Sequence, residues 1–65
     1  MTEQQLDKMY EVVTNSINMV REDLRKAKNE LVFDKENEKL ISYIEEREAK
    51  LKELREERVQ ILKQS

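Results

Sequence analysis

Two of the side chains most often used in catalysis are missing from this chain of 65 residues. The chain has no histidine and no cysteine, which excludes an imidazole base, a thiolate nucleophile, a zinc finger and a disulfide framework. The aromatic residues that carry a hydroxyl are Tyr10 and Tyr43, and neither has a candidate base beside it. A catalytic carboxylate pair needs a concave, partly dry site, whereas the acidic residues here fall on polar helical faces. We therefore expect no enzyme activity and no cofactor.

A short basic stripe is the first candidate for ligand binding. Arg21, Arg25 and Lys28 follow i, i+4, i+7 spacing, which places them on one face of a helix where they could contact phosphates. Acidic residues lie among them, and no aromatic residue is available nearby to stack an exposed base. A solvated helix face is therefore the simpler interpretation of this stripe.

An acidic cluster is the second candidate. Asp34, Glu36 and Glu38 lie close together, and such a group could contact a metal ion or a basic partner. Lys35 and Lys39 largely neutralise it, and the spacing lacks the ligand pattern and central glycine of a calcium loop. We expect no metal site here.

The charge of the chain gives no long-range attraction to nucleic acid or to an anionic membrane. Thirteen basic and fifteen acidic residues give a formal charge of -2, and the two signs are mixed throughout. The longest apolar runs, at 31–33 and 43–44, are too short for a membrane span or a signal-peptide core. We expect an intracellular, cytoplasmic protein.

The spacing of apolar residues favours helices that pack along their length. In the first half of the chain these residues are separated by alternating steps of four and three, a 3.5-residue repeat typical of a helix that packs against another helix. The members of this first seam are Leu6, Tyr10, Val13, Ile17, Val20, Leu24, Ala27 and Leu31.

A second seam follows the first in a different register. Its members are Leu40, Ile44, Arg47, Leu51, Leu54, Arg58 and Ile61. Between the seams lies 34–37, Asp-Lys-Glu-Asn, the most turn-like stretch of the chain. Asp and Asn side chains compete with helical hydrogen bonds and can cap the helix that follows. Pairing the seams about this stretch leaves neither with an overhang.

These patterns predict an all-α fold, an antiparallel helical hairpin that forms a single domain over 1–65. We expect a helix over 3–33, a turn over 34–37 and a second helix over 38–64. The alternative is one continuous helix in a parallel dimer, because no glycine or proline enforces the break.

Apolar residues outside the seams suggest that the hairpin has a partner. A two-helix hairpin buries only one seam per helix, so we expect it to assemble into a four-helix bundle or coiled coil, as a homodimer or on a helical partner. The candidate interface residues widen both helices toward the chain ends, although scattered apolar surface residues are also normal. They are Met9, Val12, Met19, Val59 and Leu62.

Arg47 and Arg58 interrupt the second seam, where a charge is costly unless it reaches water or a carboxylate. The simpler interpretation is that their methylene stems cover the seam while their guanidinium groups reach acidic neighbours. The functional alternative is that they fix the register or select the partner.

The leading functional hypothesis is a non-enzymatic module for protein–protein interaction, such as an adaptor, inhibitor, chaperone or assembly subunit, which acts through helix–helix packing and self-association. One alternative is a small RNA- or DNA-binding regulator built on a dimeric hairpin, which would need a coherent basic face. Another is a coiled-coil segment of a larger structural protein, whose helices would run uninterrupted to both chain ends. An interaction module instead needs an exposed apolar groove or patch.

Overall fold

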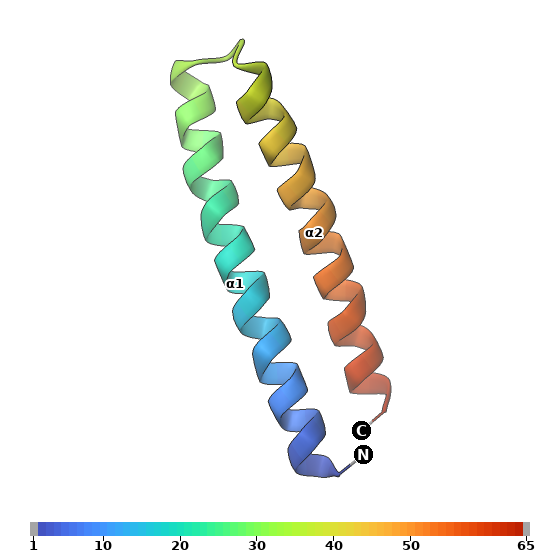
Figure 1. Ribbon diagram of the computed structural model, residues 1–65. Coiled ribbons are helices and arrows are strands. Elements are labelled where there is room, and N and C mark those ends of the chain that lie inside the picture. The colour runs from blue at the N-terminus through green and yellow to red at the C-terminus, as the bar shows by residue number, and fades with distance from the viewer. Residues whose placement is uncertain (1, 65) are drawn as a thin grey trace.

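The computed structural model describes residues 2–64 and contains two helices, α1 (Glu3–Phe33) and α2 (Glu38–Lys63). The helices run antiparallel and pack against each other (Figure 1). The start of α1 and the end of α2 therefore lie together at one end of the molecule, and we call these the outer ends of the helices. The predicted all-α helical hairpin is therefore confirmed, and the alternative of one continuous helix is wrong. The start and end of α1 and the start of α2 are as predicted, whereas α2 ends at Lys63 rather than at position 64.

A capping box starts α1. The Thr2 hydroxyl accepts a hydrogen bond of 3.2 Å from the Gln5 backbone N–H, and the Gln5 side-chain oxygen accepts one of 3.0 Å from the Thr2 backbone N–H. These bonds satisfy two backbone donors that a helix start otherwise leaves without partners.

The turn uses the two residue types that the sequence singled out. At the end of α1, the Asp34 N–H donates to the carbonyl oxygens of Glu30 and Leu31 at 3.1 and 3.2 Å. Asn37 caps α2, because its Oδ1 accepts a 3.1 Å hydrogen bond from the Leu40 N–H. Its Nδ2 donates to Asp34 Oδ2 at 3.1 Å, so the two side chains brace the turn. No residue in the described part of the chain has a positive φ, which explains how the turn forms without glycine.

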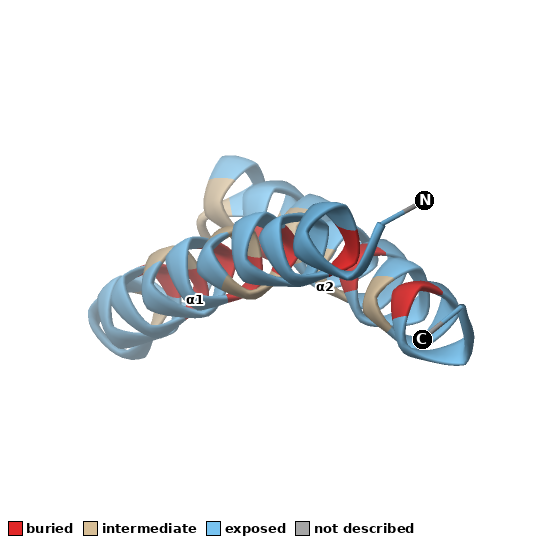
Figure 2. Ribbon diagram, turned by 90° about the horizontal axis from the view of Figure 1, so that it is seen from below, coloured by how far each residue is buried: buried red, intermediate tan, exposed pale blue. Residues whose placement is uncertain are grey.

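The core is a single layer where the helices face each other (Figure 2). Leu31, Leu40 and Leu51 are partly buried and pack against it. The buried residues all belong to the two predicted seams: Leu6, Val13, Ile17, Val20, Leu24, Ala27, Ile44, Leu54 and Ile61. Tyr10 is the exception among the apolar seam residues, because 37% of it is exposed and it lies at the edge of the seam rather than inside it.

The hairpin is long and thin. It measures 48 × 14 × 12 Å and has a radius of gyration of 15.0 Å. A compact domain of this length has a radius of about 11 Å. Each residue from 2 to 64 is therefore close to solvent on at least one side, and the buried residues among them lie in the strip between the helices.

Candidate helix-packing surfaces

Among the shallow grooves of the described residues, two lie between α1 and α2, one on each flank of the core. They share no lining residue, and they differ in chemical character. Both are open to solvent and lie between side chains of α1 and α2.

The first groove, which we call the methionine groove, lies near the outer ends of the helices and has a volume of about 490 Å³. Its floor is apolar, with Gln5, Lys8 and Glu57 at the rim. The apolar residues that line it are Met9, Val12, Val13 and Ile61.

The second groove, which we call the charged groove, has a volume of about 540 Å³ and extends along α2. Leu24, Leu51 and Val59 form its apolar part. Lys28 Nζ and Glu48 Oε1, which also line it, form an ion pair of 3.2 Å between the two helices. Its remaining lining residues are polar or charged: Lys52, Arg55, Glu56 and Gln60.

The five candidate interface residues are all exposed, but they do not form one surface. Successive helical residues are about 100° apart. Val12 and Met19 each come one residue before a buried seam residue, whereas Lys28 comes one residue after Ala27 and so lies on the opposite flank of α1. Val59 shares the charged groove with Lys28. The five residues therefore lie on two separate flanks of the hairpin rather than on one shared face.

Met9, Val12 and Met19 belong to the flank of the methionine groove. Val59 and Leu62, three residues apart on α2, belong to the other flank. The apolar stripes of both helices are wider at the same end of the hairpin, but α1 is widened on one flank and α2 on the other.

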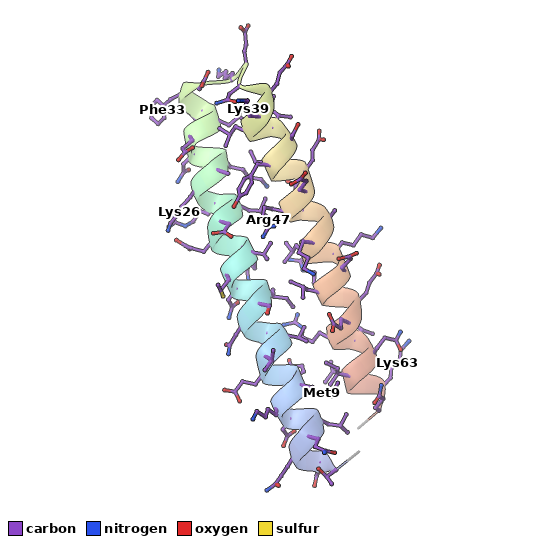
Figure 3. The ribbon with its side chains drawn as sticks, viewed as in Figure 1. Met9, Lys26, Phe33, Lys39, Arg47 and Lys63 are labelled. Carbon is purple, nitrogen blue, oxygen red and sulfur yellow. The ribbon has the colours of Figure 1, made fainter. Side chains whose placement is uncertain are left out.

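The two seam arginines lie over tyrosine rings rather than beside carboxylates. The Arg47 guanidinium carbon is 5.6 Å from the centroid of the Tyr43 ring, and that of Arg58 is 5.9 Å from the centroid of the Tyr10 ring. Arg47 projects from α2 toward α1 (Figure 3), and its buried Nε has no hydrogen-bond partner among residues 2–64. The expectation of acidic neighbours is therefore replaced by cation–π contacts, in which the negative face of the ring attracts the cation.

The basic stripe is engaged within the hairpin. Arg25 Nε donates a 3.2 Å hydrogen bond to Glu22 Oε2, and Arg25 Nη2 forms an ion pair with Glu22 Oε1. The hydrogen bond from Arg25 holds the pKa of the Glu22 carboxyl below its ordinary value and raises the pKa of Arg25. Lys28 is paired with Glu48, so two of the three basic residues already have carboxylate partners.

The acidic cluster at the turn is part of the local structure. Asp34 accepts the hydrogen bond from Asn37, and Glu38 begins α2. Within residues 2–64 no group of three or more His, Cys, Asp or Glu side chains is arranged to hold a metal ion. Neither helix, over its described length, is long and apolar enough to span a membrane.

Val32 and Phe33 are exposed apolar residues that were not predicted to form an interface. Phe33 is 91% exposed and points away from α2 beside the turn (Figure 3). The exposure of Val32 and Phe33 could have been predicted from the sequence, because only one of three consecutive helical residues can face a partner helix. With Leu31 packed against the core, the next two residues must point elsewhere.

The fold and these surfaces define the class of protein as an α-helical hairpin with an apolar groove on one flank and a charged groove on the other. The chain matches no protein-family model, and no curated protein and no solved structure is similar to it.

Proposed function

We propose that this protein is a non-enzymatic interaction module that works by helix–helix packing and self-associates. The observation that carries the proposal is the surface that the hairpin leaves accessible to water. The chain exposes 5425 Å², whereas a folded monomer of this mass exposes about 4,400 Å². The excess of about 1,000 Å² is close to the roughly 800 Å² that each partner buries in a standard interface.

The exposed surface is also apolar where a helix would pack. Met9 and Val12 are exposed yet line a groove whose floor consists of core residues of both helices. Covering them with another helix would contribute roughly 25 cal/mol for each Å² of apolar surface removed from water. Packing of one hairpin on another gives a four-helix bundle, in which each helix has two neighbours instead of one.

The mechanism that follows is burial of an apolar helical flank, with charged residues at the rim that set orientation and partner choice. Arg47 is the strongest candidate for a specificity role, because it interrupts the apolar seam and its buried Nε has no hydrogen-bond partner among residues 2–64. Such a module suits the role of an adaptor or assembly subunit.

Sedimentation equilibrium of the full chain over a wide range of concentrations tests the proposal. We expect the mass to rise with concentration from the 7.9 kDa of one chain to a multiple of it. A mass of 7.9 kDa at every concentration, together with a fully helical circular dichroism spectrum, would overturn self-association.

A further inference from the structure

We infer that the flank of α1 that carries the methionine groove seats the same flank of a second copy in antiparallel orientation, and that Met19 of each copy fills the methionine groove of the other. This inference rests on the self-association proposed above. It adds the surface, the register and the orientation of the pair.

The spacing on this flank forms a second, outer stripe on α1. Met9, Val12, Ser16 and Met19 are separated by three, four and three residues, which aligns them on one helical face beside the core. The spacing of three, four and three residues is the same in both directions, although the residue types at the two middle positions differ. A two-fold axis across its middle therefore places Met9 of one copy opposite Met19 of the other, and Val12 opposite Ser16. This is the self-complementary arrangement that a two-fold dimer requires.

The groove and the side chain that fills it lie at opposite ends of this stripe. Met9 and Val12 line the methionine groove, whereas Met19 is outside it and is 70% exposed. Ten residues of helix separate Met9 from Met19, about 15 Å at 1.5 Å per residue. The antiparallel register carries Met19 over the groove of the second copy, twice in each dimer. An unbranched methionine adapts well to an irregular apolar gap, and the small Ser16 lets Val12 approach.

Charge at the edges of the stripe favours the antiparallel orientation over the parallel one. Lys8, at the rim of the methionine groove, lies before the stripe, and Asp23 lies after it. In the antiparallel pair Lys8 of one copy comes within about one helical turn of Asp23 of the other. In a parallel pair each would lie near its own counterpart, and juxtaposed like charges cost free energy.

The opposite flank, which carries the charged groove, is a less favourable surface for binding a second copy. The Lys28–Glu48 ion pair crosses the charged groove, and four further polar or charged residues line it. A second hairpin on that flank would have to desolvate these groups, whereas the methionine groove presents apolar side chains with polar groups only at its rim.

A charge placed on the outer stripe tests the surface. We expect Met19→Asp to raise the dissociation constant of the dimer by about thirtyfold or more, because a buried carboxylate would replace the apolar side chain that fills the methionine groove. Met19 lies outside the core of the hairpin, so the helical circular dichroism spectrum should persist. Asn18→Asp is the matched control, because it adds the same charge one residue away on the opposite, exposed flank of α1 and should leave the dimer intact.

Cross-linking tests the orientation, because the chain has no cysteine of its own. A disulfide requires Cα atoms within about 7 Å. An equimolar mixture of Met9→Cys and Met19→Cys chains should therefore form a mixed disulfide dimer on oxidation, whereas Met19→Cys alone should not, because its two copies lie about 15 Å apart along the axis.

The outcomes separate this inference from the proposed function. If the wild-type chain stays monomeric, both the proposed self-association and this dimer are overturned. A helical partner of such a monomer would have to be a different protein. A dimer that tolerates Met19→Asp, or in which Met19→Cys cross-links to itself, leaves self-association standing and overturns the surface or the orientation. A dimer in which neither cysteine pair forms also overturns the register.

Discussion

The guanidinium of Arg58 lies over the ring of Tyr10, 5.9 Å from its centroid, and this contact joins α2 to α1 near the outer ends of the hairpin. Arg58 occupies a seam position, where a charge without a partner would be costly. The negative face of the tyrosine ring attracts the cation, while the arginine stem covers apolar surface. Tyr10 is 37% exposed at the edge of the seam, and its ring meets the guanidinium there.

A double-mutant cycle between Tyr10→Leu and Arg58→Met measures this contact. Both substitutions keep apolar volume but remove the ring face or the cation. We expect an interaction free energy of about 0.5–1 kcal/mol, the range for a cation–π pair at an exposed site. Urea unfolding of the four proteins gives the value. Strictly additive effects of the two substitutions would show that the contact contributes nothing to stability.

Replacing both seam arginines tests whether they act in stability or in specificity. Arg47→Leu combined with Arg58→Leu completes the apolar seam and removes the buried Nε of Arg47 that lacks a partner. We expect a higher melting temperature, by roughly 4–8 °C for each kcal/mol gained, since a hydrophobic isostere often outperforms a buried charge. We also expect a broader distribution of oligomers in sedimentation velocity. A single dimer species at the higher melting temperature would leave the arginines no role in specificity.

The positions of the helices follow from the sequence because their causes are local. The seam repeat sets the buried face, and the change of register after Leu31 coincides with Asp34 and Asn37, whose side chains then cap and brace the turn. Periodicity also places all the buried residues in the two seams. It does not show how deeply each seam residue is buried, because Leu31, Leu40 and Leu51 are partly buried and Tyr10 is exposed.

The surfaces were harder to predict because they depend on which flank of the seam a residue occupies. Met9 and Val59 both lie near the outer ends, yet they line different grooves. Counting apolar residues by their distance from the turn cannot distinguish the flanks, whereas the order of residues around a helical wheel can. The partners of Arg47 and Arg58 depend on side-chain conformation, because tyrosines and carboxylates both lie within reach of a flexible arginine.

Ile17 is expected to be a sensitive core position. It is only 3% exposed, the lowest value among the core residues. Ile17→Ala should lower the free energy of unfolding by about 2–5 kcal/mol, because it removes buried methyl groups and leaves a cavity. Asn15→Ala is the control, since Asn15 is exposed on the same helix and alanine favours helix formation. Thermal unfolding followed by circular dichroism gives both values, and equal melting temperatures would contradict the assigned core.

The Glu22–Arg25 pair predicts that the stability of the fold depends weakly on pH, with a definite sign. The hydrogen bond from Arg25 lowers the pKa of Glu22 in the folded chain. A lowered folded pKa stabilises the fold above the ordinary pKa of the group, and this contribution is lost as the pH falls through the folded value. We expect a nuclear magnetic resonance titration of the Glu22 carboxyl carbon to give a midpoint below the ordinary value for glutamate. Arg25→Gln should raise that midpoint, and an unchanged midpoint would show that the pair does not persist in solution.

The turn decides between a hairpin and a rod, and two side chains stabilise it. Asn37→Ala removes the cap of α2 and the hydrogen bond to Asp34, and should cost about 1 kcal/mol. Adding Asp34→Ala replaces both turn-favouring residues with the strongest helix former, so the free energy of a continuous helix approaches that of the hairpin.

The distance between spin labels at Glu3 and Gln64 measures the proportion of hairpin to continuous helix. They should lie close together in the wild-type chain, whereas a continuous helix would separate them by about 90 Å. Lys35→Ala, an exposed change in the same turn, should keep the short distance. A long distance in the wild-type chain would contradict the hairpin, whereas a double variant as stable as the wild type would show that Asp34 and Asn37 are not what holds the turn.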